Sequence, residues 1–407
     1  MSAFALHPVD VLVVGLGPAG GAAAAAAARA GATVLAVDRR SRAGTPVQCA
    51  ELIPLPLASH ATGDGIVVQR VRDMRTALPS GACESTAMPG LMIDRAAFDA
   101  SLVRIAQHVG AVVALATSLR SVDPAARCAT VLADGVLTRI RYRVLIAADG
   151  PGSRVAAALG LPRLPVVQTR QYTVPLVRPF DTTDVWLGPA CTGGYAWLFP
   201  KGDVANLGVG LDPSLGGNLK ASLDGLHDAL VAAGRVGRAV LCRTGGAIPV
   251  GGLREHLVAG AVAFAGDAGG FTHPVSGAGI ASAVRSGEAA GLAAAREAAG
   301  DASALDDYAD EMRDEFDAAL GRAVARRAAL RGAWGRPAAG HDATHRRGWI
   351  AFPEYWRIKA DQPDRDRRTS DQPDRDRRTS DQSDRDRRRA ACRPALLPPD
   401  QPDRVLT

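Results

Sequence analysis

The stretch DVLVVGLGPAGGAAAAAAARAGATVLAVD, residues 10–38, decides the fold of this 407-residue chain. A short β-branched run leads into glycines, a long run of small residues follows, and a second apolar run closes the stretch. This order is typical of a strand, a tight turn, a helix and a second strand. Gly15, Gly17 and Gly20 stand in the turn with GxGxxG spacing. We therefore predict a Rossmann-like α/β unit that binds a dinucleotide.

Each glycine of this turn has a separate task in such a unit. Gly15 permits the tight turn, Gly17 lets the backbone approach a pyrophosphate, and Gly20 lets the helix pack closely on the strand. The positive end of the helix dipole then faces the phosphates. Asp38 ends the second strand, where an acid binds the ribose hydroxyls of the adenosine. An acid at this position favours FAD or NAD over NADP; a glycine-rich turn without a ligand is the alternative.

Two further pairs of glycine and acid favour FAD over NAD. Asp149–Gly150 follows the apolar run VLIAA, and Gly266–Asp267 follows VAFA. The second acid could bind the ribityl hydroxyls of a flavin. The helix that begins soon after it could direct its N-terminus at the N1–O2 edge of the ring and stabilise the negative charge of the reduced form. Three residues at the start of that helix join the predicted cofactor contacts: Gly277, Gly279 and Ile280.

Composition limits the classes of partner. Hydrophobic residues make up 47% of the chain, so it can bury a sizeable core, and the net charge is only +6. This small surplus gives no reason to expect nucleic acid as a partner. The six cysteines form no CxxC pair, so we expect no metal site. Residues 1–10 lack the basic region of a secretory signal, and the alanine-rich run is too short to span a bilayer, so we expect a cytoplasmic protein.

The predicted fold class is α/β (α+β), with a Rossmann-like FAD-binding domain interleaved with a β-sheet substrate domain. C-terminal helices and a disordered tail complete the chain. The expected divisions are FAD-binding domain at 1–75, 91–164 and 245–300; substrate domain at 76–90 and 165–244; helical region at 301–359; and low-complexity tail at 360–407. Within the tail, the segment DQPDRDRRTS occurs twice and a close variant follows. The repeats have no apolar residue able to make a core, so we expect a disordered segment, and their nearly equal Asp and Arg content argues against a nucleic-acid-binding tail.

Smaller patterns predict individual elements. Residues 91–110 should form a strand end and an amphipathic helix with Phe98, Leu102 and Ile105 on one face. Asp134–Gly135 should be the turn of a hairpin.

Aromatic residues mark two stretches. Tyr195, Trp197 and Phe199 alternate and should share one face of a strand. They form either the core of a sheet or the wall of an apolar substrate channel. The segment GWIAFPEYWRIK, residues 348–359, mixes aromatic and basic residues. It suits either a peripheral membrane contact or a C-terminal helix that docks on the core.

The three glycine and acid motifs, in this order, resemble the FAD-dependent flavoproteins with the p-hydroxybenzoate hydroxylase fold. Within this superfamily, four stretches resemble the geranylgeranyl reductase family, over about residues 8–300. They are PVQCAE at 46–51, DRAAFDASLVRIAQHVGA at 94–111, GGYAWLFPKGDVANLGVG at 193–210 and AGDAGGFTHPVSGAGIASAVRSGEAAG at 265–291. Members of that family use FAD to reduce isolated carbon–carbon double bonds in polyprenyl chains.

The resemblance implies a set of FAD contacts. By matching motifs, these are Gly20, Asp38, Cys49, Ala50, Arg95, Asp267, Gly279 and Ile280. It also implies a hydrophobic or lipid substrate, which would pass along Tyr195, Trp197 and Phe199. The chain departs from the family pattern at His273–Pro274, which is closer to the hydroxylases, and at Ala278, where reductases often carry an acid.

We therefore expect an FAD-dependent reductase of a geranylgeranyl-type substrate. A flavin-dependent monooxygenase acting on an aromatic or polyketide substrate and a non-catalytic flavin-binding protein are the alternatives. No second GxGxxG motif is present, so the electron donor would be NADPH without its own Rossmann domain, or ferredoxin. Cys49 and His273 are the candidate catalytic acids. Cys49 either faces the reactive side of the flavin or is a small residue that lets the loop pass close to the ring.

Overall fold

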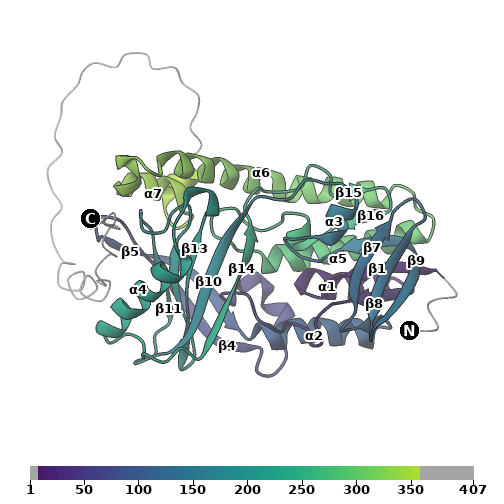
Figure 1. Cartoon of the computed structure of the whole chain (residues 1–407), viewed down its shortest axis with the longest axis horizontal. Helices are drawn as coiled ribbons and strands as arrows, with labels where there is room; N and C mark the ends of the chain where they lie inside the picture. Colours follow the sequence, from purple (N-terminus) through teal and green to yellow (C-terminus); the bar gives the residue numbers. More distant parts are fainter. Residues whose placement is uncertain (1–7, 358–407) are drawn as a thin grey trace, which may run out of the picture.

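The computed structural model describes residues 8–357, so the repeat segment and Lys359 lie outside the described residues. Two eight-stranded sheets stand side by side, with helices between and above them (Figure 1). The long helix α6 runs along the top of the view from the first sheet to the second. This arrangement confirms the mixed α/β fold class.

The first sheet has a parallel centre in the order β16-β9-β1-β2-β6, and β15 pairs antiparallel with β16. The antiparallel strands β7 and β8 extend it along the first half of β9. Its strands are β1 (Val9–Val14), β2 (Val34–Val37), β6 (Val112–Ala114), β7 (Ser118–Asp123), β8 (Cys128–Ala133), β9 (Val136–Ala147), β15 (Val258–Ala259) and β16 (Val262–Phe264). The hairpin expected at Asp134–Gly135 joins β8 to β9, and both residues have positive φ, as a tight hairpin turn requires.

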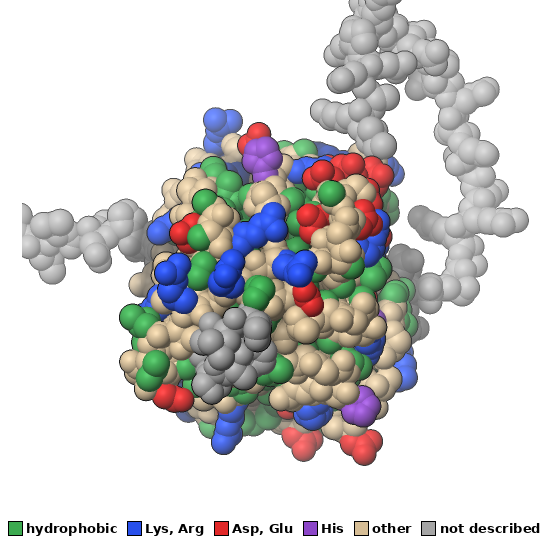
Figure 2. Space-filling model, turned by 90° about the vertical axis from the view of Figure 1, so that its right-hand side faces the viewer, with side chains coloured by type: hydrophobic (Ala, Val, Ile, Leu, Met, Phe, Trp, Pro, Cys, Tyr) green, Lys and Arg blue, Asp and Glu red, His purple; other side chains and the backbone are tan. Residues whose placement is uncertain are grey.

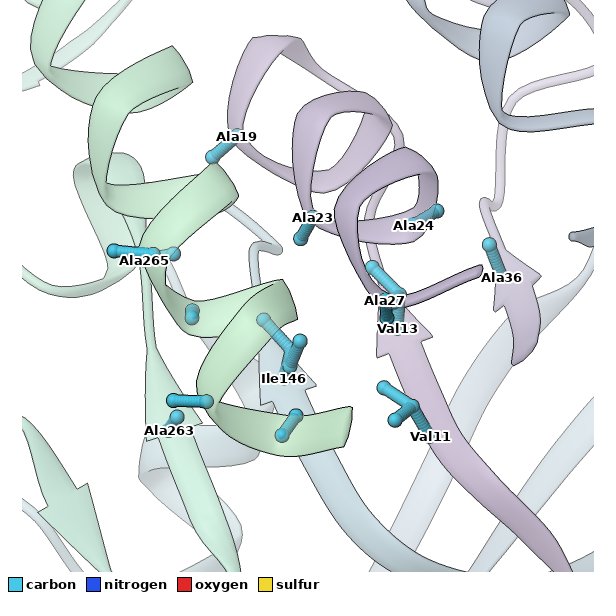
Figure 3. Close-up of a cluster of buried hydrophobic side chains, with 14 of the residues drawn as sticks. Val11, Val13, Ala19, Ala23, Ala24, Ala27, Ala36, Ile146, Ala263 and Ala265 are labelled. Atoms are coloured by element: carbon cyan, nitrogen blue, oxygen red, sulfur yellow. The ribbon is translucent and has the colours of Figure 1, made fainter. Parts of the chain in front are cut away.

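Alternating residues of β1 enter two separate cores. Val11 and Val13 point toward α1 (Pro18–Arg29) and α5 (Ile280–Ala298), while Leu12 and Val14 point toward β7, β8 and α3 (Arg154–Ala158). Figure 3 shows how alanines of α1 meet the sheet and α5. Small side chains let these two helices lie almost in backbone contact, so the alanine-rich run is a buried helix as predicted.

The second sheet runs β14-β10-β13-β12-β11-β4-β5-β3, and only the pair β11–β4 is parallel. Its strands are β3 (Leu52–Pro54), β4 (Val67–Ala77), β5 (Cys83–Ile93), β10 (Val166–Pro175), β11 (Thr182–Trp186), β12 (Ala196–Lys201), β13 (Val204–Leu211) and β14 (Cys242–Pro249). The first chain segment that contributes strands to this sheet, β3 to β5, spans residues 52–93. It is longer than the segment 76–90 that we expected to belong to the substrate domain. The later segment extends to Pro249 because β14 pairs with β10 along its whole length.

The remaining helices cover the sheets. Leu223, Leu226 and Leu230 of α4 pack on one face of the second sheet, and the C-terminal helices pack on the other. These elements are α2 (Arg95–His108), α4 (Leu219–Ala232), α6 (Ala304–Ala333), α7 (Asp342–Gly348), α8 (Pro353–Trp356) and the short 3-10 helices η2 (Leu55–His60), η3 (Pro213–Leu215), η4 (Gly266–Ala268) and η5 (Pro337–Gly340). Between residues 301 and 357 the chain forms α6, η5, α7 and α8.

The predicted buried face of α2 is wrong at Ile105. Phe98 and Leu102 of α2 are buried, but Ile105 is 37% exposed. Val103 and Ala106 are buried in its place, because the second half of α2 turns this side toward α1 and the first sheet. At the end of the molecule next to the first sheet, charges of both signs share the surface, with basic side chains gathered near the middle of the view (Figure 2).

Candidate active site

The predicted cofactor residues meet at the carboxyl edge of the first sheet. Gly15, Asp38, Asp149 and Asp267 each follow the end of one of four neighbouring strands, β1, β2, β9 and β16. Parallel strands bring such ends together at one edge of a sheet, which is where ligands bind in open α/β folds. The topology therefore gathers residues that are far apart in the sequence.

The three glycines of the turn have the geometry that their predicted roles require. Gly15 has φ of +95°, and a Cβ there would lie 2.3 Å from the carbonyl oxygen of Ala148. A Cβ at Gly20 would lie 1.8 Å from the carbonyl oxygen of Gly15. Gly17, by contrast, has no atom within 4 Å of a Cβ position, and no side chain in the described part of the chain caps α1. The start of α1 is thus open and fits a pyrophosphate.

Asp38 is held by two backbone amides. The N–H groups of Leu16 and Arg40 each donate to its carboxylate at 2.7 Å. The amide of Leu16 ties the end of β2 to the glycine turn. The carboxylate oxygens keep further lone pairs, so the group can also accept from ribose hydroxyls.

The other two acids have different environments. Asp149 accepts from the amides of Arg154 and Val155, which places one oxygen at the start of α3. Its other oxygen, Oδ1, is buried and has no hydrogen-bond partner among residues 8–357. Asp267 accepts from Thr272 Oγ1 at 2.5 Å. Burial raises the pKa of both carboxyl groups. Both acids are half-buried, and the unpartnered Oδ1 of Asp149 fits a site that a polar ligand completes.

Three more predicted contacts lie beside Asp267. Gly277 has φ of +70° in the turn before α5, and a Cβ at Gly279 would lie 2.7 Å from Thr272 Oγ1, the group that donates to Asp267. Ile280 begins α5, whose N-terminus has no side-chain cap from the described residues. Gly150, with φ of +85°, completes the turn after β9. The turn at Gly277 and the open start of α5 fit the predicted flavin edge.

Arg95 begins α2, and its side chain is only 15% exposed. Its guanidinium makes a two-pronged ion pair with Asp99, at 2.9 and 3.0 Å. Burial opposes its charge, but attraction to Asp99 and then to the Cys49 thiol, together with hydrogen bonds, raises its pKa overall. The charge of Arg95 partly offsets the rise that burial causes in the pKa of Asp267. It therefore lies electrostatically close to both the cysteine loop and the second acid.

Residues of the second sheet fix the loop that carries Cys49 and Ala50. Gln171 donates to the Cys49 carbonyl at 3.0 Å, and Asn206 donates to the Ala50 carbonyl at 3.3 Å. Thr244 donates to the carbonyl of Val47 at 2.8 Å. Three different strands thus hold one loop, which places the Cys49 thiol at the boundary between the two sheets.

Glu51 is the residue that sequence reasoning missed. It has φ of +69°, an unusual value for a side chain of this size. Its carboxylate accepts from Lys201 at 2.8 and 2.9 Å, from Asn206 at 2.8 Å and from the amide of Arg95 at 3.0 Å. The amide of Glu51 in turn donates to Cys49 Sγ at 3.2 Å. Position 51 was visible within the motif PVQCAE, but its partner Lys201 is 150 positions away.

Tyr195, Trp197 and Phe199 divide between the core of the second sheet and the lining of a hollow. Trp197 and Phe199 are buried in the core of the second sheet. Trp197 and Tyr195 also line a hollow of about 320 Å³, counted with the solvent at its mouth, whereas Phe199 does not. Trp197 donates to Gln171 at 3.2 Å. This aromatic hollow is lined by Val167, Thr169, Gly194, Tyr195, Trp197, Gly210, Ile248, Val250, Pro274, Val275, Gly277 and Arg327.

His273 holds the turn before α5. Its Nδ1 accepts from the amide of Ser276 at 3.1 Å, so the remaining proton lies on Nε2, which is 3.2 Å from the Tyr355 hydroxyl. Burial lowers its pKa to about 4, so the ring is neutral near pH 7. Tyr195 donates to the carbonyl of Ser276 at 2.5 Å from the other side. The turn is thus fixed by the second sheet and by the C-terminal region.

The C-terminal aromatic cluster is mostly core. Trp349, Phe352 and Tyr355 are buried, and only Trp356 is substantially exposed, at 53%. The segment 349–356, which includes α8, therefore docks on the second sheet. Three of its four aromatic residues are too buried to contact a membrane. Within residues 8–357, no helix has the length and apolar character to cross a bilayer, and no cluster of potential metal ligands is found.

Solved structures define the class. A geranylgeranyl bacteriochlorophyll reductase-like protein from Thermoplasma acidophilum aligns with a TM-score of 0.73 and 26% identity over 80% of this chain and 88% of its own. Aklavinone-11 hydroxylase in complex with FAD and aklavinone aligns with a TM-score of 0.64 and 21% identity, over 81% of this chain and 71% of its own, which shows a shared fold. The architecture is that of Rossmann-like FAD-binding flavoproteins.

Curated relatives define the family. Digeranylgeranylglycerophospholipid reductase 1 of Methanopyrus kandleri is 35% identical over 303 residues, which is 69% of this chain and 79% of the relative. The digeranylgeranylglycerophospholipid reductase of Methanococcus aeolicus is 30% identical over 69% of this chain and 75% of its own length. No family model matches the chain. The chain belongs to the geranylgeranyl reductase family of FAD-dependent oxidoreductases, as the sequence motifs predicted.

Proposed function

We propose that this protein binds FAD and reduces carbon–carbon double bonds of a polyprenyl, geranylgeranyl-type substrate. The observation that carries the proposal is one contact zone. The Cys49 loop, the turn at Gly277 and the aromatic hollow converge where the two sheets meet. An apolar chain could lie in this hollow beside the flavin edge that the turn would hold.

The residues of the first sheet account for cofactor binding. The open start of α1 at Gly17 and Gly20 would hold the pyrophosphate, and Asp38 would accept from the ribose. Asp149, Asp267 and Arg95 would complete the polar contacts, with Gly15 and Gly150 shaping the turns. Reduced FAD, when bound, supplies the hydride that adds to one carbon of the double bond. An external donor, NADPH or ferredoxin, would restore the reduced state.

The second carbon of the alkene needs a proton, and Cys49 is the better of the two candidate donors. Its sulfur accepts from the amide of Glu51, which leaves the S–H free to point elsewhere. His273 is neutral, and both of its ring nitrogens have partners in the turn. We therefore assign Cys49 as the general acid and His273 as a positioning residue. Trp197 and Tyr195 would keep water away from the reacting carbons.

Product analysis tests this proposal. FAD-loaded protein is incubated with dithionite and geranylgeranyl compounds in the absence of oxygen, and the masses of the products are measured by mass spectrometry. The proposal predicts a gain of two hydrogens for each double bond that is reduced. A product that gains an oxygen atom, and forms only in air, would instead assign the protein to the flavin monooxygenases.

A further inference from the structure

A buried arginine lies at the end of the cofactor edge that would hold the flavin. Arg254 stands in the loop between β14 and β15 and is only 6% exposed. The strand order places β16, and with it Asp267, at this end of the edge, whereas β2 and Asp38 lie toward the other end. Within residues 8–357 the guanidinium contacts backbone carbonyls and makes no ion pair with a carboxylate. A buried arginine without such a pair is unusual.

The side chain of Arg254 joins two segments that frame the cofactor edge. Its Nε donates to the Ala268 carbonyl at 2.6 Å, and its Nη1 donates to the Pro162 carbonyl at 2.7 Å. Ala268 ends η4, which contains Asp267, and Pro162 follows α3. One guanidinium therefore holds the segment that carries Asp267 against the segment that follows α3.

The backbone around Arg254 keeps the guanidinium within reach of η4. The amide of Arg254 donates to the Gly269 carbonyl at 2.9 Å. Gly270 has φ of +83°, and a Cβ there would lie 2.1 Å from the carbonyl oxygen of Gly252. The two loops are thus in backbone contact. A substitution of the side chain can therefore remove its hold on η4 and leave the two loops together.

The guanidinium carries a charge that no ion pair from the described residues neutralises. Burial lowers its pKa, and attraction to the Asp149 carboxylate partly offsets this, but an arginine stays protonated near pH 7. Its central carbon lies 5.4 Å from the centroid of the Phe264 ring. Arg95, by contrast, is paired with Asp99. Negative charge on a bound ligand would therefore interact strongly with Arg254 in this desolvated place.

We propose that Arg254 is a positioning residue for the cofactor: it holds η4 in the conformation that binds FAD, and its charge makes the site favour reduced FAD. Reduction adds negative charge to the flavin ring, so a fixed cation nearby stabilises the reduced form more than the oxidised form. This inference rests on FAD binding, which is part of the proposed function, and does not depend on the substrate.

Two measurements on the FAD-loaded protein test this role. Release of FAD on dilution is followed by flavin fluorescence, and the reduction potential of bound FAD is measured against redox dyes. Arg254→Met removes the charge and both side-chain hydrogen bonds, whereas Arg254→Lys keeps the charge but loses the fork that reaches both carbonyls. Arg243→Met is the control, because it removes an exposed arginine that lies over Tyr172 in the second sheet.

The variants should separate the two parts of the role. Arg254→Met should weaken FAD binding about tenfold. It should also lower the affinity for reduced FAD relative to oxidised FAD about tenfold, which lowers the two-electron potential by about 30 mV. Arg254→Lys should weaken FAD binding but keep the potential of the wild type, and Arg243→Met should change neither. A residue that only stabilised the fold would not divide the two readouts in this way.

Two results would overturn the role of Arg254. One is wild-type FAD release and potential in Arg254→Met. The other is an equal drop in potential in Arg254→Met and Arg254→Lys, because the lysine keeps the charge. If Arg254→Met does not fold, Arg254→Gln takes its place in both measurements.

Product analysis separates these outcomes from the proposed function. If double bonds are reduced but the potential of Arg254→Met is that of the wild type, the function stands and the role of Arg254 fails. If the potentials differ as expected but no double bond is reduced, the role of Arg254 stands and the proposed reduction fails.

Discussion

At the scale of single residues, Cys49 carries the chemical part of the account. Its loop is fixed by Gln171, Asn206 and Thr244, so the position of the thiol does not depend on the sulfur itself. A substitution at Cys49 can therefore remove the proton donor and leave the loop in place. This separation makes the proposed role testable.

Cys49→Ala should keep FAD bound and lower the rate of alkene reduction about 100-fold or more, which is the usual contribution of a general acid. Cys242→Ala removes an exposed free thiol and should leave the rate unchanged. Flavin absorbance of the purified proteins and turnover under anaerobic conditions measure the two effects. Full turnover in both Cys49→Ala and Cys49→Ser would mean that the thiol has no chemical role.

Breaking the ion pair between Glu51 and Lys201 should lower the stability of the protein. Both side chains are nearly buried, at 5% and 17% exposed. Lys201→Met would leave the Glu51 carboxylate buried without its cation, at a cost of about 3–5 kcal/mol. The double variant Glu51→Gln, Lys201→Met should recover most of this loss. Urea unfolding measures both, and a single variant as stable as the wild type would show that the pair is not structural.

At the scale of elements, contacts between backbones decide how the helices fit. A Cβ at Gly287 of α5 would lie 2.2 Å from the carbonyl oxygen of Ala19 in α1. These two helices cover the same face of the first sheet, and α1 begins at the pyrophosphate turn. Their separation therefore affects the shape of the cofactor site.

Gly287→Ala should destabilise the protein by about 1–3 kcal/mol, because the new methyl group forces α1 and α5 apart. It should also weaken FAD binding. The matched control is Gly321→Ala on α6, where a Cβ meets nothing within 4 Å. That change should stabilise the protein by about 0.5–1 kcal/mol. If Gly287→Ala is as stable as Gly321→Ala, the two helices are not held at backbone contact.

The turn that contains His273 predicts a dependence on pH. Its pKa is about 4 in the folded state against an ordinary value of 6.5. Between these values the unfolded chain binds more protons, so the free energy of unfolding falls as the pH is lowered from about 6.5 toward 4. Urea unfolding at about pH 7 and about pH 5 should show a smaller drop for His273→Asn than for the wild type. Equal drops in the two proteins would mean that His273 does not cause this effect.

Local sequence patterns predicted many single helices and strands, but they missed one helix and did not predict which side of another helix is buried. The helix α4 was not predicted, although Leu219, Leu223, Leu226 and Leu230 are spaced for one helical face and Asn218 caps it. Strand-like alternation in the flanking segments led to the interpretation of residues 165–244 as a β-rich domain. Ile105 fits the face of α2 by spacing and is nevertheless exposed, because the surface offered by α1 decides which side of the helix is buried.

At the scale of the whole molecule, the sequence was enough to predict that Gly15, Asp38, Asp149 and Asp267 meet at one edge of the first sheet. The carboxyl ends of neighbouring parallel strands always lie at the same edge. The sequence could not predict contacts across sheets. The Glu51–Lys201 pair, the anchoring of Cys49 by Gln171 and the ion pair of Arg327 with Asp212 all join segments that are far apart in the sequence. These contacts depend on how the second sheet and α6 are placed, and that placement has no local pattern.

The central claim is that a reduced flavin in this site passes its electrons to an isolated double bond. A single-turnover experiment without oxygen tests it most directly. Reduced, FAD-loaded protein is mixed with geranylgeranyl diphosphate, and flavin absorbance and product mass are followed together. The account predicts that the flavin reoxidises with one double bond saturated for each flavin. A flavin that stays reduced until oxygen is admitted would contradict it.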